Sequence, residues 1–508
     1  MVVAWPPKLA FNANRDAINK NNSRQNEDLK QKSTANFEQL LRDHTTSLRG
    51  ILETTSNSFR AHVLELSRQS ENKTLNVFSQ VYRRMLPLSR QLIHDLYTRK
   101  KVSSNRFLLR YLTVADERQL EAAVHAFFVN LFPVAYHQAV HLNSDGGTGD
   151  LHDDYIACLK STFEDLQPFG DIPKELSKNL IQSATAATVF VSALERGAEV
   201  LASTEQLDSM YLKPACQTHL LKMSYCPECN GHGKQHAKAC FSYCLNVMRG
   251  CLAQYVGVLD GPWSNVAEAI ERLVSTSVQS DNGVVSTIKG LDAKLSEAIM
   301  RAMENGPDLE KKVKKTCGTP KLIPVDKNAS NENKPLQQIS VKWATPPDAE
   351  LLHFLSTIEK SKDFYSKIVD NLCEDEEFQR NDRHCWTGDK IGDYTQTAMP
   401  TGVDAQRYNP EVPLMQHSYN KLQVTKLNEL VDKLIKLRST IVNAVSFIFV
   451  TLIEMLIENL QKFMCSCCFD SISNFHRTYF MLILVTILFS EPITLVKVVE
   501  DKFPLVCF

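Results

Sequence analysis

CPECNGHGKQHAKACFSYCLNVMRGCLA, residues 226–253, contains five of the fourteen cysteines of this 508-residue chain. On a helix, Cys240, Cys244 and Cys251 lie within about 40° of one another, because offsets of four and eleven residues are close to whole turns. One stripe of the predicted helix therefore offers three sulfurs. A disulfide within a single helical turn is poorly shaped, so each sulfur is expected to hold a separate segment of the chain.

Two other interpretations of these cysteines come from their neighbours. A tetrahedral zinc site has ligand spacing of this kind, and the six candidate ligands are Cys226, Cys229, His232, His236, Cys240 and Cys244. A redox-active Cys-x-x-Cys belongs at the start of a helix after a strand, a pattern that the sequence does not show. Disulfides are favoured, so no metal or cofactor is predicted. The alternative is an intracellular helical scaffold protein with a Cys/His zinc site at residues 226–244.

The cysteine count and the sequons both indicate a secretory route. Ten cysteines lie between Cys158 and Cys385, an even number, as is typical of proteins from an oxidising compartment. Candidate N-glycosylation sites are Asn72 and Asn328, with a weaker one at Asn21. The remaining cysteines, Cys465, Cys467, Cys468 and Cys507, are assigned no role.

The composition favours an all-α protein that does not bind nucleic acid. Glycine (18) and proline (20) are scarce, and long stretches are rich in strong helix formers. Lysine plus arginine (57) nearly balance aspartate plus glutamate (58), so the chain has no global positive field to attract a polyanion. No paired carboxylates and no Ser-His-Asp arrangement suggest catalysis, and we predict no enzyme activity.

Apolar residues recur at helical spacing over most of the chain. The pattern from Phe37 to Leu66 predicts one long amphipathic helix, with a possible break near Ser56. Residues 77–97, 120–132 and 176–194 continue the helical pattern, and no segment has a strong strand signal. The run Lys311–Lys315 is predicted to be a solvated helix end, although contact with anionic glycans is also considered.

The chain is divided by composition into three parts. Residues 1–25 form an atypical segment with no signal peptide pattern, residues 26–412 a helical core, and residues 413–508 an apolar tail. Within the core, residues 316–347 lose the periodicity and are predicted to be an exposed loop. In the tail, the uncharged runs Ser439–Ile453 and Thr478–Ser490 are shorter than the roughly 20 residues of a membrane span. A buried helix, an interfacial segment and a span all remain open.

Residues 226–253 resemble the glypican signature, with its Cys-x-x-Cys pair, a spacer ending in cysteine, an aromatic-cysteine step and a closing Gly-Cys. Other glypican-like passages flank it in the same order. They are LFPVAYHQ at Leu131, DDYIACL at Asp153, KTCGTPK at Lys315, CWTG at Cys385 and NPEV at Asn409. The resemblance extends from Asn26 to Val412.

The resemblance implies an elongated, all-helical ectodomain without catalytic residues. It implies the core protein of a cell-surface heparan sulfate proteoglycan on the extracellular side of the plasma membrane, held by a glycosylphosphatidylinositol anchor. The implied partners are secreted growth factors and morphogens of the Wnt, Hedgehog, FGF and BMP types, for which it would be a co-receptor. Since no serine is followed by glycine in this sequence, we identify no glycosaminoglycan attachment site.

The resemblance also implies how the cysteines pair. The expected disulfides are Cys158–Cys317, Cys216–Cys251, Cys240–Cys385 and Cys244–Cys373. In the family, Cys226 and Cys229 resemble the acceptors for an N-terminal cysteine cluster that this sequence does not contain. These two cysteines are therefore expected either to bond to each other or to remain thiols that form intermolecular bridges.

Overall fold

The structure is a computed structural model, and it describes eleven stretches of the chain. They are residues 15–97, 117–141, 149–205, 214–229, 238–280, 283–320, 322–324, 348–374, 379–380, 382–414 and 421–466. The chain forms two compact units, Met1–Ile448 and Phe449–Phe508. The first unit contains all of the elements described below apart from the end of the last helix.

Helices make up nearly all of the described chain, and the prediction of an all-α protein is confirmed. In chain order they are α1 (Arg15–Gln80), α2 (Leu86–Tyr97), α4 (Glu117–His141), α5 (Asp153–Ser161), α6 (Phe163–Leu166), α7 (Ile172–Glu205), α9 (Pro214–Ser224), α10 (Cys226–Cys229), α11 (Phe241–Tyr255), η1 (Val256–Asp260), α12 (Gly261–Leu273), η2 (Val274–Val278), α13 (Val284–Lys289), α14 (Leu291–Glu304), α15 (Gly306–Cys317), α16 (Asp348–Lys360), α17 (Phe364–Glu374), α18 (Val403–Gln406) and α19 (Lys421–Ser466).

In the part of the chain that the structure describes, six short strands form two small sheets. They are β1 (Gly149–Leu151), β2 (Ala239–Cys240), β3 (Leu322–Pro324), β4 (Gln379–Arg380), β5 (Cys385–Trp386) and β6 (Ile391–Gly392). β1 pairs antiparallel with β3, and the second sheet has the order β4-β2-β5-β6. Strands of two or three residues are too short to show alternating hydrophobicity, so the sequence carries no strong strand signal for them.

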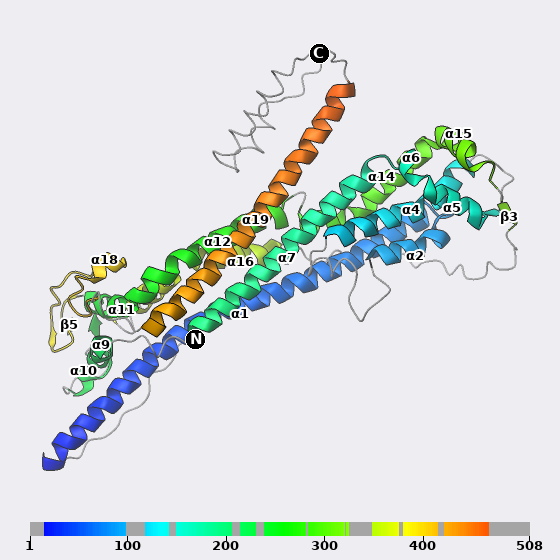
Figure 1. The fold of residues 1–508 in the computed structure, drawn as a ribbon. Coiled ribbons are helices and arrows are strands. Elements are labelled where there is room, and N and C mark those ends of the chain that lie inside the picture. The colour runs from blue at the N-terminus through cyan, green and yellow to red at the C-terminus, as the bar shows by residue number, and fades with distance from the viewer. Residues whose placement is uncertain are drawn as a thin grey trace, which may run out of the picture. The chain divides into compact units, whose positions relative to one another are not determined.

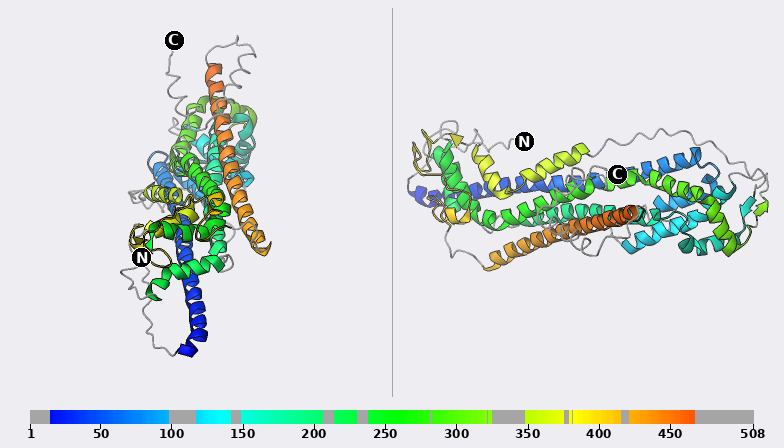
Figure 2. Two further views of the ribbon diagram at one scale, coloured as in Figure 1. Left: turned by 90° about the vertical axis from the view of Figure 1, so that its left-hand side faces the viewer. Right: turned by 90° about the horizontal axis from the view of Figure 1, so that it is seen from above.

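The long N-terminal helix is continuous. The possible break near Ser56 does not occur, since α1 runs through this residue and buries it. α1 and α7 pack side by side (Figures 1 and 2), and Phe59 meets Phe190 edge to face with ring centroids 5.0 Å apart. Burial of the apolar stripe of α1 against α7, α9 and α2 is what keeps so long a helix folded.

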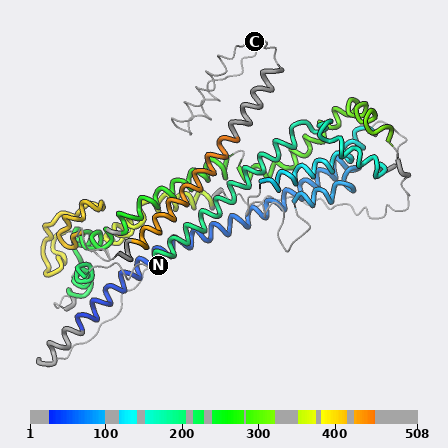
Figure 3. The backbone as a smooth tube through the Cα atoms, in the orientation of Figure 1, coloured from blue at the N-terminus to red at the C-terminus, as the bar shows by residue number. Residues whose placement is uncertain are grey.

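The two ends of the first unit differ in how they are built (Figure 3). At one end, α4, α5, α6, α14 and α15 pack around an aromatic cluster made of Phe128, Phe132, Phe163 and Phe169. At the other end, short helices and the four-stranded sheet are joined by disulfides. We call this second end the cysteine-rich lobe, defined as α9, α10, α11, α17, β2 and residues 379–380 and 382–414.

The predicted loop at residues 316–347 lies largely outside the described residues. Where the structure does describe it, α15 continues to Cys317 and Leu322–Pro324 forms β3. The loop between residues 325 and 347 therefore stays a prediction. Residues 382–414 are irregular with very short elements, as their polar composition indicates.

The last helix, α19, has features of a packed helix and of a membrane-spanning helix. Its buried residues alternate at spacings of three and four: Leu427, Leu430, Leu434, Leu437, Ile441, Ala444 and Ile448. Such a heptad seam is typical of helix packing, and Lys433 of α19 pairs with Glu199 of α7 at 3.4 Å. By length and composition, residues Thr425–Thr451 are also long and apolar enough to cross a membrane, and most of this stretch is not buried. A buried helix, an interfacial segment and a membrane span stay alternative predictions for this segment. The boundary at residue 413 also stays a prediction.

Candidate functional site: the cysteine-rich lobe

Three disulfides meet around α11. Cys251 bonds to Cys216 of α9, Cys244 bonds to Cys373 of α17, and Cys240, just before α11, bonds to Cys385 of β5. The three Cα–Cα distances lie between 5.0 and 5.8 Å. α11 is thus tied to three segments that are distant in sequence, as the single stripe of sulfurs led us to expect.

The prediction that Cys240 lies on the same helix was wrong by one residue. Its backbone is extended, with φ −63° and ψ 142°, and it stands at the N-cap position of α11. This conformation lets β2 pair with β4 and β5 in parallel. The sulfur of Cys240 still faces the lobe because the helix starts directly after it.

The fourth disulfide lies at the other end of the first unit. Cys158 of α5 bonds to Cys317 at the end of α15, with Cα atoms 5.9 Å apart. The four disulfides seen among the described residues join the pairs that the family resemblance implies. The side chain of Cys229 is outside the described residues, so the bonding of Cys226 and Cys229 stays a prediction.

The zinc interpretation is not supported by the lobe. Cys240 and Cys244 are bonded to Cys385 and Cys373, and a cystine sulfur cannot bind Zn²⁺ as a thiolate. The histidines at positions 232 and 236 lie outside the described residues. Within the described part of the chain, no group of three or more Cys, His, Asp or Glu side chains is placed to hold a metal ion.

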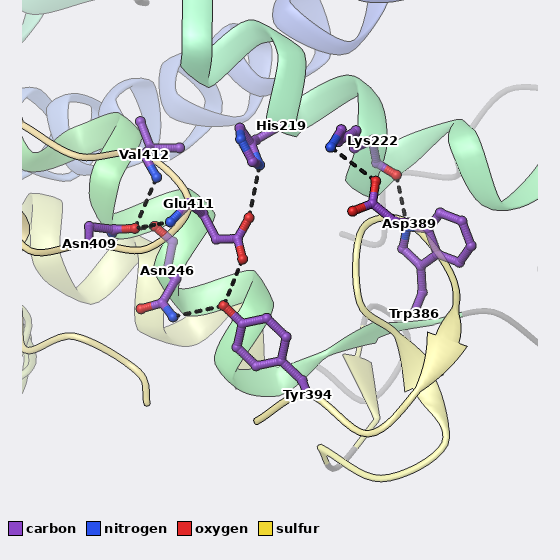
Figure 4. Close-up of polar contacts among 9 residues, drawn as sticks. All are labelled: His219, Lys222, Asn246, Trp386, Asp389, Tyr394, Asn409, Glu411 and Val412. Carbon is purple, nitrogen blue, oxygen red and sulfur yellow. Dashed lines mark hydrogen bonds and ion pairs between the residues drawn. The ribbon is translucent and has the colours of Figure 1, made fainter. Parts of the chain in front are cut away.

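A buried polar network links α11 to the segment 394–412 (Figure 4). The Asn246 amide nitrogen donates to the Tyr394 hydroxyl and the Thr397 carbonyl, both at 3.1 Å, and its amide oxygen accepts from the Met399 N–H at 2.8 Å. Asn409 donates to the Asn246 carbonyl at 2.7 Å. The polar groups of a fully buried asparagine are thus satisfied, which fixes the segment on the helix.

Tyr394 carries the network on to α9. Its hydroxyl donates to Glu411 Oε1 at 2.9 Å, and Glu411 Oε2 lies 3.1 Å from His219 Nδ1 (Figure 4). Burial, together with the negative charge of Glu411, raises the pKa of Tyr394, although the hydrogen bond from Asn246 opposes this. The phenol therefore stays protonated and keeps donating to the carboxylate.

The CWTG turn, residues 385–388, is hydrogen-bonded to α9. The Trp386 indole N–H donates to the Lys222 carbonyl at 2.9 Å, and Lys222 Nζ lies 3.0 Å from Asp389 Oδ1. Gly388 has φ +103°, and a Cβ there would lie 2.6 Å from the Tyr243 hydroxyl. Both its backbone angle and this close approach require glycine in the turn.

Two aspartates cap helices from other segments. Asp382 accepts from the Ser242 N–H at 2.8 Å, at the start of α11, and Asp260 accepts from the Tyr365 and Ser366 N–H groups at 2.8 and 3.1 Å, at the start of α17. Burial raises the pKa of Asp260, while these hydrogen bonds oppose the shift. Each cap satisfies amides that the helix itself cannot.

The predicted glycosylation sites are described only in part. Asn72 is exposed on α1, whereas Thr74 of the same sequon is buried with its hydroxyl 3.1 Å from that of Tyr97. Asn328 and the side chain of Asn21 lie outside the described residues. N-glycosylation of the chain stays a prediction.

The disulfide pattern and the lobe agree with the comparisons with known proteins. A family model described as glypican matches residues 20–452. The chain belongs to the glypican family. The match begins before Asn26 and ends forty residues after Val412, so it includes the first part of α19.

Relatives and solved structures agree with this assignment. The chain is 50% identical over 426 residues to the division abnormally delayed protein of Drosophila melanogaster, covering 82% of this chain and 67% of the relative. It is 29% identical to human glypican-5, covering 78% and 66%. It thus spans about two thirds of the length of these relatives. The crystal structure of full-length glypican-1 core protein matches with a TM-score of 0.62 at 27% identity, over 84% of this chain and 90% of that one.

Membership of the family defines the class of function. Glypicans are the core proteins of heparan sulfate proteoglycans and form no enzyme family. The described residues of the lobe make disulfides, helix caps and internal hydrogen bonds. Family comparison of the cysteines indicated these bonds, but nothing in the sequence indicated the network around Asn246 and Asn409.

Proposed function

We propose that this chain is a cell-surface co-receptor whose cysteine-rich lobe binds secreted growth factors or morphogens. The proposal is supported by the 50% identity to a glypican-family relative together with the disulfide-tied lobe. By family, the chain would be held on the extracellular side of the plasma membrane by a glycosylphosphatidylinositol anchor.

The lobe suits binding because it is rigid yet irregular. The Cys240–Cys385 disulfide and the buried Asn246 network tie residues 382–414 to α11 and to the strand before it. Irregular segments fixed on a rigid framework often carry binding residues, and a surface that does not reorganise loses less entropy when it binds.

Tyr408 is the most exposed large hydrophobic side chain that the structure describes. It is 81% exposed, while its neighbour Asn409 is buried and bonded to Asn246. The backbone of Tyr408 is therefore fixed, although its ring is open to solvent. Tyrosine is enriched among residues that dominate binding energy at protein interfaces, which makes Tyr408 our candidate contact residue.

The test is capture of labelled ligands by cells that express the full chain. Cells are first treated with heparinase, so that only binding by the protein is measured, and Wnt-type and BMP-type ligands are compared. Tyr408→Ala is expected to reduce capture of at least one ligand by about tenfold, as at an interface hot spot. Met300→Ala, at a 53% exposed residue of α14, is the matched control and should leave capture unchanged.

The two variants separate the role of the lobe from the function itself. If Tyr408→Ala and Met300→Ala both bind like the wild type, Tyr408 is not a contact residue. If the wild-type protein captures neither class of ligand after heparinase treatment, binding by the protein lobe is wrong.

A further inference from the structure

Helix α15 presents a strongly basic face to solvent. Its sequence GPDLEKKVKKTC has four lysines and two acidic residues. Taking Lys311 as zero, rotation of 100° per residue places Lys315, Lys312 and Lys314 at about +40°, +100° and −60°. All four lysines are exposed. They share an arc of about 160°, and Val313 lies directly opposite.

The inner face of α15 holds this orientation. Leu309 and Val313 are 4% and 0% exposed, and the helix packs against α4, α5 and α14. At its end, Cys317 is bonded to Cys158 of α5. The lysines therefore cannot rotate into the core, and the basic face is a fixed feature of the surface.

The acidic residues of α15 neutralise this face only in part. Lys311 Nζ lies 3.7 Å from Asp308, with both side chains 80% exposed, and Lys314 Nζ lies 2.7 Å from Glu310. Exposed pairs within one helix are weak and exchange readily for other anions. Lys312 and Lys315 make no ion pair with any residue that the structure describes, so two charges stay available.

A polyanion with closely spaced charges fits four lysines on one helix face. Runs of this kind are typical of heparin-binding or nucleic-acid-binding patches, and the nearly neutral whole chain offers no general attraction to nucleic acid. At a cell surface the abundant polyanions are sulfated glycosaminoglycans.

We propose that the outer face of α15, formed by Lys311, Lys312, Lys314 and Lys315, docks a sulfated glycosaminoglycan chain noncovalently. This is distinct from heparan sulfate attached covalently to a core protein. It rests on the family assignment and not on the lobe, so it can fail without affecting the proposed ligand binding by Tyr408.

The simpler interpretation is that lysines at a helix C-terminus only stabilise the helix dipole. Lys314 and Lys315 lie in the last turn of α15 and are placed for that role. The dipole favours cations wherever they lie around that turn, whereas docking depends on the four charges acting together on one face. Binding of a polyanion therefore distinguishes the two.

The experiment uses the full chain, pretreated with heparinase, on a sensor surface of immobilised heparin. Lys312→Ala with Lys315→Ala is expected to lower the affinity by about tenfold and to reduce its salt dependence, as expected when two charge contacts to a polyanion are lost. Lys312→Arg with Lys315→Arg should retain binding. Circular dichroism confirms that each variant remains helical.

The matched control removes two exposed lysines from α19, with Lys426→Ala and Lys436→Ala. It has the same change in net charge and should bind heparin like the wild type. An equal loss in the control would show attraction by bulk charge and overturn the site. Three other results would also overturn the proposed site. They are no binding by the wild type at physiological salt, equal competition by desulfated heparin and by heparin, and unchanged binding by the α15 variant.

Discussion

Gly250 of α11 touches the backbone of Val412. A Cβ added at Gly250 would lie 2.6 Å from the Val412 carbonyl oxygen and 2.7 Å from its Cβ. The segment 409–412 cannot easily move away from α11. The Val412 N–H donates to the Asn409 side chain at 3.0 Å, and Asn409 donates to the Asn246 carbonyl. The glycine before Cys251 therefore lets the segment 409–412 lie directly on the helix.

Gly250→Ala is expected to destabilise the protein although alanine is the better helix former. The added methyl group overpacks a fixed contact, so the unfolding free energy should fall by about 1–3 kcal/mol. Urea denaturation followed by circular dichroism measures the change. Gly261→Ala is the control, since nothing lies within 4 Å of its Cβ position, and it should be neutral or stabilising by up to about 1 kcal/mol. Equal effects in the two variants would contradict the proposed contact.

Asn409→Ala should remove hydrogen bonds that connect α11 to the segment 394–412. The side chain donates to the Asn246 carbonyl and to Gln406 Oε1, and it accepts from the Glu411 and Val412 N–H groups. Leaving buried groups without partners is expected to cost about 2–4 kcal/mol of unfolding free energy.

The control for Asn409 is Asn443→Ala, at an exposed position of α19. It should change the unfolding free energy by less than about 0.5 kcal/mol. Thermal and urea unfolding are compared for both variants. A loss below about 1 kcal/mol in Asn409→Ala would mean that water replaces the network, contrary to our description.

Much of the helical framework could be predicted from periodicity. The apolar stripe of α1 is buried where spacing placed it, with Phe37, Leu52 and Leu66 at 5% exposure or less. Helices of this length repeat the same local pattern many times, so the signal is strong. A break near Ser56 was considered possible because a buried serine within a helix resembles a break in the pattern.

The lobe could be predicted only in outline. Cysteine spacing indicated that several segments meet on α11, and the family resemblance indicated which ones. The contact between Asn246 and Asn409 joins residues 163 positions apart, and no local pattern connects them. The need for glycine at position 388 depends on the Tyr243 ring, which only the folded structure brings there.

Loss of the disulfide between Cys158 and Cys317 should loosen one end of the first unit. The bond closes a loop of 159 residues, so Cys158→Ser with Cys317→Ser is expected to lower the unfolding free energy by about 2–4 kcal/mol. Both positions are only half-buried, so the new hydroxyl groups can be solvated.

Hydrogen exchange of backbone amides tests which helices lose stability when this disulfide is removed. The amides of α15 should exchange faster in the double variant, while those of α11, which three other disulfides hold, should keep their wild-type rates. Faster exchange in α11 to the same degree as in α15 would show that the first unit unfolds as a whole, against our expectation of a local effect.

The buried carboxyl of Asp260 should make stability depend on pH. Burial raises its pKa above the ordinary value of 3.8, so the folded state binds this proton more tightly than the unfolded chain does. The stabilisation from Asp260 is therefore complete below that ordinary value and is lost as the pH rises through the raised pKa. Asp260→Asn is neutral at every pH and lacks this change. The stability advantage of the wild type over the variant should consequently shrink as the pH rises above 3.8 and through the raised pKa.

Urea denaturation of both proteins at several pH values measures this difference and cancels the titration of the other carboxyl groups. Asp432→Asn, at an exposed position of α19, is the matched control and should differ from the wild type by less than about 0.5 kcal/mol throughout. An advantage that grows with pH would mean that the folded-state pKa is lowered, because the bonds from Tyr365 and Ser366 outweigh burial. An advantage that is constant with pH would mean that Asp260 acts only as a cap for α17, through hydrogen bonds that do not depend on its charge.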